Sequence, residues 1–170
     1  VSDHFKNFLG GWMKYSPDIF MFYSPYPTSF KRFVSESFAP TKISWSMDNR
    51  TSTYRIVGEE SSLRIECRIP GADANPYLAF AASIAAGIKG IEEKIDPPQM
   101  SKGDSYNNNS LESCPDNIGK GLQLFEKSKF ISDVFGNNVK DHYNHFFSIE
   151  KSLYEKAVTD WEKNRYFERI

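Results

Sequence analysis

The pattern of hydrophobic and polar positions predicts an α+β fold in which helices pack on an antiparallel sheet. Over 2–15 the apolar side chains recur at helical spacing. The Gly10-Gly11 pair inside this segment indicates either a very close packing contact or a short helix. The proline- and aromatic-rich segment 16–40 predicts an ordered loop.

Three strand-like segments follow, at 41–47, 52–57 and 63–69. Apolar and polar residues alternate in the first of them, as in a half-buried strand. The turn residues 58–61 connect the other two, so we expect these to form an antiparallel hairpin.

The second half of the chain predicts helices separated by one long polar loop. Asn75 and Pro76 are favourable N-cap and first-turn residues, and the largely apolar segment that follows, to about position 95, predicts a buried helix. The Asn- and Ser-rich segment 96–117 predicts a long surface excursion. The remaining helices are expected at 119–127, at 129–135 and, as one long amphipathic helix, at 138–167.

Composition and charge narrow the classes of function. The 170 residues carry 21 basic and 22 acidic side chains, and the net charge of −1 argues against a general binder of nucleic acid or of anionic membranes. The longest apolar stretch is shorter than the roughly 18–20 residues of a membrane span. Two cysteines are too few for a disulfide scaffold, so a reducing, cytoplasmic setting is the default expectation. Because the chain has no initiator Met, we expect it to be a piece of something longer.

Arginine is concentrated in one part of the chain, since five of the seven arginines lie between positions 32 and 68. Guanidinium groups suit sites that hold phosphate or carboxylate in fixed geometry, but ordinary surface ion pairs are an equal alternative. In the third strand, Arg64, Glu66 and Arg68 share the face opposite Ile65 and Cys67. A carboxylate between two guanidinium groups suits a metal-bound nucleotide, although a salt-bridge ladder would show the same pattern.

Several motifs occur in order along the chain. They are Ser29-Phe30-Lys31-Arg32, Trp45-Ser46-Met47-Asp48-Asn49-Arg50-Thr51, Arg64-Ile65-Glu66-Cys67-Arg68-Ile69-Pro70-Gly71-Ala72-Asp73-Ala74-Asn75-Pro76-Tyr77-Leu78, Asp160-Trp161-Glu162 and Arg165-Tyr166-Phe167-Glu168-Arg169. With these motifs at these spacings, the whole chain resembles the glutamine synthetase family. The resemblance implies that residues 1–170 are the C-terminal part of the catalytic domain. The N-terminal β-grasp domain and the first part of the catalytic domain would then be missing.

The resemblance implies an ATP-dependent ligase, in which the side-chain carboxylate of glutamate takes the γ-phosphoryl group of ATP and an amine then displaces phosphate. Matched by motif, Arg32 corresponds to the arginine that binds the α-carboxylate of the substrate. Arg50 corresponds to the arginine beside the transferring phosphoryl group, and Arg68 to the one near the reacting carboxylate. Phosphoryl transfer depends mainly on positioning and charge neutralisation, which suits such a site.

The resemblance also implies the cofactors and the assembly. Arg55 and Arg64 match residues on the other ATP phosphates, and Glu66 matches a ligand of Mg²⁺ or Mn²⁺. The full-length protein is expected to be a homo-oligomeric ring, and the piece alone is expected to be inactive because other metal ligands are missing from it. His142 and His145 are expected to serve surface or core packing and not to form a set of metal ligands.

Phe38 departs from the pattern of the ammonia-using members, which carry a glutamate at this position on a flap that helps to bind ammonium. In this respect the chain is similar to the γ-glutamylpolyamine synthetase branch, which implies an apolar acceptor pocket for a larger amine.

Two alternatives for the function remain open. One is a non-catalytic structural oligomer, like the eye-lens members of the family, although retention of the arginines argues against it. The other is a guanidino-kinase-like phosphotransferase, which would not explain the segment 71–78.

Overall fold

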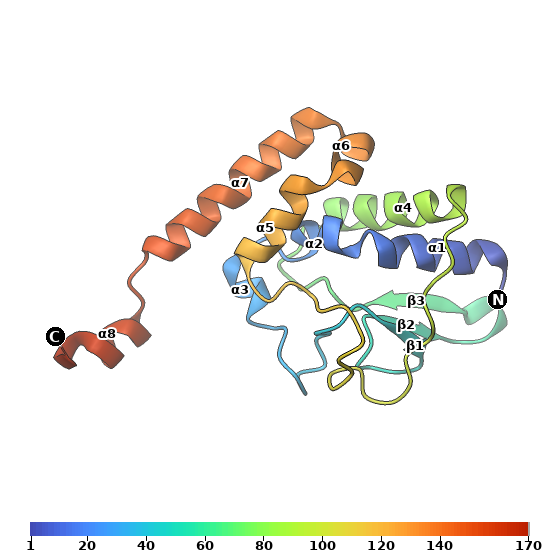
Figure 1. Ribbon diagram of the computed structural model, residues 1–170, viewed down its shortest axis with the longest axis horizontal. Helices are drawn as coiled ribbons and strands as arrows, with labels where there is room; N and C mark the ends of the chain where they lie inside the picture. Colours follow the sequence, from blue (N-terminus) through green and yellow to red (C-terminus); the bar gives the residue numbers. More distant parts are fainter. Residues whose placement is uncertain (170) are drawn as a thin grey trace.

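The computed structural model describes residues 1–169, which form a helical layer over a small sheet and a helical arm that extends away from both (Figure 1). The elements are α1 (Asp3–Lys14), α2 (Ser16–Tyr23), α3 (Pro27–Phe30), β1 (Trp45–Met47), β2 (Tyr54–Val57), the 3₁₀ helix η1 (Glu60–Ser62), β3 (Arg64–Cys67), α4 (Pro76–Glu92), α5 (Ile118–Lys127), α6 (Lys129–Phe135), α7 (Asn137–Lys156), α8 (Asp160–Tyr166) and the 3₁₀ helix η2 (Phe167–Arg169). This mixture confirms the expected α+β class. None of the helices in the described part of the chain is long and apolar enough to cross a membrane.

Among the described residues the strand order of the sheet is β1-β2-β3. As expected, β2 and β3 pair antiparallel, with Tyr54 opposite Cys67 and Arg55 opposite Glu66. β1 and β2, in contrast, pair in parallel. The sheet is therefore mixed, with β2 as its central strand, and the expectation of a purely antiparallel sheet is wrong for β1.

The parallel pairing follows from the short connection between β1 and β2. Asp48 adopts a left-handed backbone conformation (φ 43°), which turns the chain sharply after β1. The Asn49 side chain then accepts hydrogen bonds from the Thr51 backbone N–H (2.9 Å) and hydroxyl (2.8 Å), so the connection folds back on itself. Tyr54 consequently enters β2 beside Trp45, at the start of β1.

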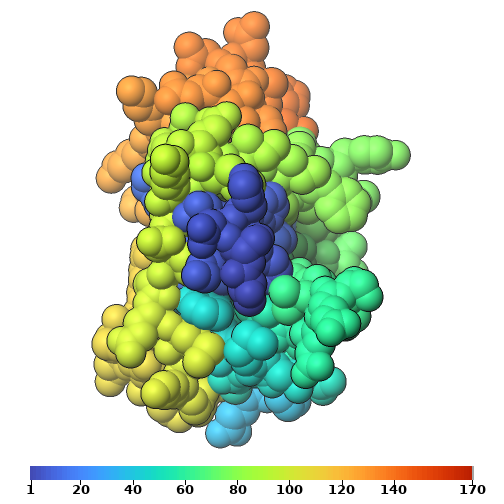
Figure 2. Space-filling view, turned by 90° about the vertical axis from the view of Figure 1, so that its right-hand side faces the viewer, coloured from blue at the N-terminus to red at the C-terminus, as the bar shows by residue number. Residues whose placement is uncertain are grey.

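Helix α1 lies between α4 and the sheet (Figures 1 and 2), and its contact with α4 depends on glycine. A Cβ atom on Gly11 would lie 2.3 Å from the Cα of Gly90. Likewise, a Cβ atom on Gly90 would lie 2.2 Å from the backbone oxygen of Asn7. Both distances are far inside van der Waals contact, so the two backbones approach this closely only because neither residue has a side chain. The glycine pair in α1 therefore marks a close packing contact.

The segment 16–40 is more ordered than the expected loop, because it contains α2 and α3. Pro17 and Pro27 stand in the first turns of these helices, where a missing N–H breaks no hydrogen bond. The aromatic residues form core, and the buried Phe22 ring packs edge-on against rings of α5, α6 and α7. Proline thus starts helices here, and the prediction of a loop is wrong for α2 and α3.

The predicted single helix over 138–167 is also wrong, because this segment forms two helices, most of α7 and all of α8. Ala157, the residue after α7, has an extended backbone. Thr159 then caps α8, since its hydroxyl accepts the N–H of Glu162 while the Glu162 carboxylate accepts the N–H of Thr159 (2.7 Å). Along the expected apolar stripe Phe146 is half-buried but Trp161, on the arm in Figure 1, is 65% exposed.

Candidate active site

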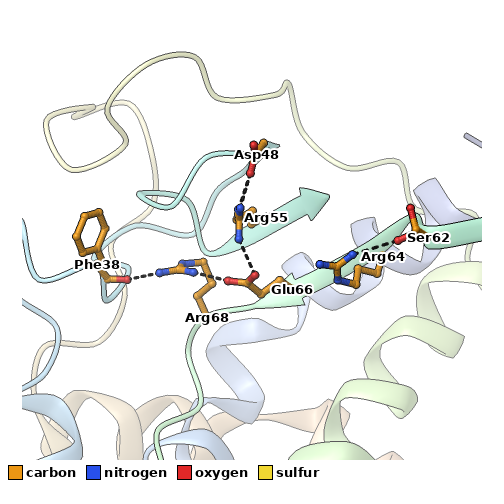
Figure 3. A network of polar contacts seen from close by, with 7 residues as sticks. All are labelled: Phe38, Asp48, Arg55, Ser62, Arg64, Glu66 and Arg68. Atoms are coloured by element: carbon orange, nitrogen blue, oxygen red, sulfur yellow. Dashed lines mark hydrogen bonds and ion pairs between the residues drawn. The ribbon is translucent and has the colours of Figure 1, made fainter. Parts of the chain in front are cut away.

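A carboxylate on β3 lies between two guanidinium groups (Figure 3). Arg55 Nη1 donates a hydrogen bond to one oxygen of Glu66 at 2.9 Å, and Arg68 Nη1 donates to the other oxygen. Arg55 also donates through Nε to Asp48 at 2.9 Å. We call Asp48, Arg55, Glu66 and Arg68 the arginine–glutamate network. The side chains of Arg55 and Arg68 are 17% and 16% exposed and that of Glu66 is 35% exposed, so the network is partly shielded from water.

The sheet places these groups together. Arg55 and Glu66 are directly opposite in the antiparallel register, and Arg68 follows Glu66 by two residues on the same face. On the other face the fully buried Ile56 and Ile69 anchor both strands to the core. Partial burial acts to raise the pKa of the Glu66 carboxyl, but the hydrogen bonds from Arg68 and Arg55 outweigh it and lower that pKa. Glu66 is therefore held as a carboxylate.

Arg68 also contacts the loop 34–40, which carries Phe38. Its Nη2 donates to the Phe38 carbonyl oxygen at 2.8 Å. Phe38 and Glu36 both adopt left-handed backbone conformations, with φ of 59° and 65°, which costs roughly 1–2 kcal/mol at a residue other than glycine. The Phe38 ring is 58% exposed and points away from Arg68 in Figure 3. Phe38 thus meets the network through its backbone.

The structure separates Arg64 and Arg50 from the network. Arg64 lies on the same strand as Glu66, but its Nη1 donates to the Ser62 carbonyl oxygen at 3.2 Å, apart from the carboxylate (Figure 3). Arg50 is exposed in the β1–β2 connection, and no hydrogen bond or ion pair joins its side chain to another described residue. Both guanidinium groups are available to an external anion.

Arg32 lies in the segment after α3 and is not part of the arginine–glutamate network. It donates to the backbone oxygen of Ile69, and its guanidinium carbon lies 4.8 Å from the centroid of the Phe33 ring. Burial, together with the charge of Arg68, lowers the pKa of Arg32, and Asp73 acts in the opposite direction. The structure therefore brings Arg32 into electrostatic range of Arg68 and leaves it outside the carboxylate contact.

Sequence reasoning missed the role of the segment 96–117. Four serines, which we call the serine cluster, join this loop to β1 and to the connection between β1 and β2: Ser46, Ser52, Ser101 and Ser105. Ser105 Oγ lies 3.1 Å from Ser52 Oγ and 3.0 Å from Ser101 Oγ, and Ser46 Oγ donates to the Ser101 carbonyl oxygen at 2.9 Å. All four serines are buried, so the prediction of a surface excursion is wrong for this part of the loop. The cluster fixes the connection that carries Arg50.

The described residues by themselves do not fit the expected metal ion. Within residues 1–169 no group of three or more His, Cys, Asp and Glu side chains could hold a metal ion. Both oxygens of Glu66, the expected ligand, already accept guanidinium hydrogen bonds. His142 and His145 are both exposed on α7, outside any such group. A metal site that includes Glu66 would need ligands from other chain segments.

Comparison with known proteins identifies the family. The family model "Glutamine synthetase, catalytic domain" matches residues 1–166. The chain belongs to the glutamine synthetase family. This confirms the resemblance drawn from the motifs.

Among curated relatives in this family, gamma-glutamylethanolamide synthetase GlnA4 of Streptomyces coelicolor is 39% identical over 170 residues, which are 100% of this chain and 37% of the relative. Glutamate–isopropylamine ligase of a Pseudomonas species is 34% identical over 167 residues, which are 96% of this chain and 36% of the relative. The chain thus spans little more than a third of these relatives.

A solved structure of the family has the same fold. The GmaS/ADP complex superposes with a TM-score of 0.87 at 28% identity, and the match covers 99% of this chain and 40% of that one. The overall fold of the described residues is therefore that of a solved structure similar to this chain.

Proposed function

We propose that this chain is part of an ATP-dependent ligase that joins the side-chain carboxylate of glutamate to an amine. Family membership supports this, as do relatives named as a gamma-glutamylethanolamide synthetase and a glutamate–isopropylamine ligase and a structural neighbour in complex with ADP. The observation that carries the proposal is the arginine–glutamate network. It places two shielded guanidinium groups on a rigid hairpin, where they can stabilise anionic reactants.

In the proposed reaction, a glutamate carboxylate oxygen attacks the γ-phosphorus of ATP and the bond to the β–γ bridging oxygen breaks, which releases ADP. The amine nitrogen then attacks the acyl carbon of the γ-glutamyl phosphate, loses a proton and expels phosphate. We assign Arg55, Arg50 and Arg64 to the ATP phosphates, where guanidinium groups neutralise charge in the transition state. The exposure of Arg50 and Arg64 supports this assignment, because neither has an ion-pair partner among the described residues.

On the glutamate side, we assign Arg68 to the reacting carboxylate and Arg32 to the α-carboxylate. The hydrogen bond from Arg32 to the backbone oxygen of Ile69, the residue after Arg68, supports a shared dicarboxylate ligand. A flexible surface pair would not hold two carboxylates in fixed positions, whereas Arg68 is held at both Nη atoms, by Glu66 and by the Phe38 carbonyl.

Phe38 supports an acceptor larger than ammonia. Ammonium in a partly dry site needs a negative partner, and a phenyl ring provides none. The ring can instead cover the hydrocarbon part of an amine, worth about 25 cal/mol per Å² buried. We therefore propose that the acceptor is an alkylamine, with the 58% exposed ring as part of its binding surface.

The test is phosphate release by the full-length protein that contains this chain, with ATP, glutamate and a panel of ammonia, short alkylamines and polyamines. We expect turnover that requires both ATP and glutamate, and the highest kcat/KM with an alkylamine. If ammonia gives the highest kcat/KM, the acceptor assignment fails and the ligase assignment stands. Absence of turnover with every amine would favour the non-catalytic alternative.

We further propose that the full-length protein is a cytoplasmic homo-oligomeric ring. The exposed apolar residues of the arm support an interface there, among them Leu153, Val158 and Trp161. Light scattering of the full-length protein tests this directly, and a monomer would contradict it.

A further inference from the structure

Asp48 is the one member of the arginine–glutamate network to which the family resemblance assigns no role. Its Oδ1 atom accepts two hydrogen bonds from Arg55, one from Nε at 2.9 Å and one from Nη2. On the other side, Arg55 Nη1 donates to Glu66 Oε2 at 2.9 Å. The guanidinium group of Arg55 therefore lies between two carboxylates (Figure 3).

The two carboxylates leave part of this guanidinium group free. A guanidinium group has five N–H donors in one plane. In Arg55 three of them are used, the one on Nε and one on each Nη atom. One N–H on each terminal nitrogen thus has no acceptor within residues 1–169. Such a pair of donors suits an oxyanion, for instance a phosphate group, which can accept from both at once.

The backbone that carries Asp48 is fixed. Its N–H donates to the Ile56 carbonyl oxygen at 2.9 Å, and the next residue, Asn49, donates through Nδ2 to the Gly103 carbonyl oxygen at 2.7 Å. The left-handed conformation of Asp48 (φ 43°) is one that aspartate and asparagine tolerate. Because only one methylene group joins the carboxylate to this backbone, few positions are open to it, although the side chain is 75% exposed.

Asp48 and Arg55 also line a surface cavity of about 420 Å³. Its charged lining residues are Asp48, Arg55, Glu59 and Arg64. Both arginines have been assigned above to the ATP phosphates, so the cavity joins them in one space. The carboxylate of Asp48 repels an anion there less than a free carboxylate would, because it is paired with Arg55.

We propose that Asp48 is a positioning residue for the ATP phosphates, which holds the guanidinium plane of Arg55 so that its free N–H groups face the phosphate. This inference rests on the proposed ligase function. The single hydrogen bond to Glu66 would leave the guanidinium group free to turn about that contact. The two hydrogen bonds to Asp48, at the Nε edge, prevent this rotation. Fixed placement of charge is what phosphoryl transfer requires of such a group.

The experiment compares two variants of Asp48 in the full-length protein, by the calorimetric Kd for ADP and by kcat/KM for ATP with the best amine. Asp48→Gly removes the carboxylate, and glycine fits the left-handed backbone. We expect its Kd for ADP to rise and its kcat/KM for ATP to fall, each about tenfold, the range for lost hydrogen bonds to a charged group. KM for glutamate should be unchanged.

Asp48→Asn separates position from charge. Asparagine keeps an acceptor oxygen at the same place and tolerates the same backbone conformation, but it has no charge. We expect both quantities to stay within about threefold of wild type, because most of the orientation of Arg55 is retained. Lys94→Gly is the control, since Lys94 is exposed and has a φ of 53°, so that it too places glycine at a left-handed position. Its Kd for ADP should equal that of wild type.

Wild-type values of both quantities in Asp48→Gly would overturn the inference and leave the ligase function intact. Tighter binding of ADP in either variant would also overturn it, because Asp48 would then compete with the phosphates for Arg55. An equal loss in the two variants would mean that the charge of Asp48 acts and its position does not, which again contradicts the inference. If wild type neither binds ADP nor turns over with any amine, the proposed function itself fails and the inference fails with it.

Discussion

The contact between α1 and α4 and the arginine–glutamate network differ in what holds them together. The helices meet at glycines whose missing side chains let two backbones touch, and the interface needs nothing from outside. In the network, four charged side chains on or next to the strands hold one another by hydrogen bonds, partly in contact with water. Arg68 Nε remains unpaired there.

The contact between α1 and α4 is fully packed, whereas the charged side chains of the network can bind a ligand. A packed glycine contact tolerates no added atom, so any change there should appear as lost stability. The network, in contrast, contributes little to stability, because partly exposed ion pairs contribute about 0–1 kcal/mol each. A change there should appear mainly in activity.

The largest effect is expected from Glu66→Gln in the full-length protein. The amide keeps the shape of the side chain but leaves Arg55 and Arg68 without their shared negative partner. We expect turnover to fall roughly a hundredfold to a thousandfold, or about 3–4 kcal/mol in barrier, because the arginines would no longer be held toward the reactants. The measurement is steady-state phosphate release with ATP, glutamate and the best amine.

Glu126→Gln is the control for this variant. Glu126 is exposed on α5 and has no ion-pair partner among the described residues, so the same chemical change should leave turnover unaltered. If Glu66→Gln lowered the melting temperature as much as a substitution in the core does, the network would contribute to stability and not mainly to activity.

Gly11→Ala is expected to have a smaller effect, which should appear in stability and not in activity. The new Cβ atom would lie 2.3 Å from the Cα of Gly90 and 2.4 Å from the carbonyl oxygen of Ala86, so the helices would have to separate. We expect the free energy of unfolding of the full-length protein to fall by about 2–3 kcal/mol. Thermal or urea unfolding measures this.

Gly119→Ala provides the matched comparison in α5. Its Cβ atom would meet only side-chain atoms, Asn117 Oδ1 at 3.1 Å and Lys151 Cε at 3.4 Å. Alanine also has a helix propensity about 1 kcal/mol better than glycine, so this variant should be neutral or stabilising. If both alanine variants unfold like wild type, the glycine contact between α1 and α4 is not a constraint on the fold.

The same division explains what the sequence alone could predict. The β2–β3 hairpin and α4 depend on local signals: alternation along the strands, a turn at 58–61, and Asn75 with Pro76 at the helix start. The placement of Glu66 opposite Arg55 was not predicted, because the expected partners of the carboxylate were Arg64 and Arg68, and Arg64 donates to Ser62 instead. The hairpin and the start of α4 required no knowledge of distant contacts and are correct. The prediction that α4 is buried is wrong for one face, where Tyr77, Phe80, Ile84 and Ile88 are exposed.

The features that were missed depend on distant contacts or on overlooked caps. The serine cluster joins residues more than 50 positions apart, and serine in a polar segment gives no sign of such a partner. The parallel pairing of β1 follows from the left-handed conformation of Asp48, which its residue type permits but does not dictate. The break before α8 did have a local signal, since Thr159 and Glu162 form a capping box.

The smallest expected effect is a pH dependence of stability that comes from Glu66. The hydrogen bonds from Arg68 and Arg55 outweigh partial burial and lower the pKa of this carboxyl in the folded protein. A lowered folded-state pKa means that the stabilising contribution is complete above the unfolded-state pKa, about 4.3, and is lost as the pH falls through the folded-state value. Because 35% of the side chain is exposed, water screens the pairs and the contribution stays below about 1 kcal/mol. The stability difference between wild type and Glu66→Gln should therefore be constant from pH 5 to 7 and shrink below pH about 4. Urea unfolding at a series of pH values measures it, and a difference that grew on acidification would mean that Glu66 is not held as a carboxylate by its two arginines.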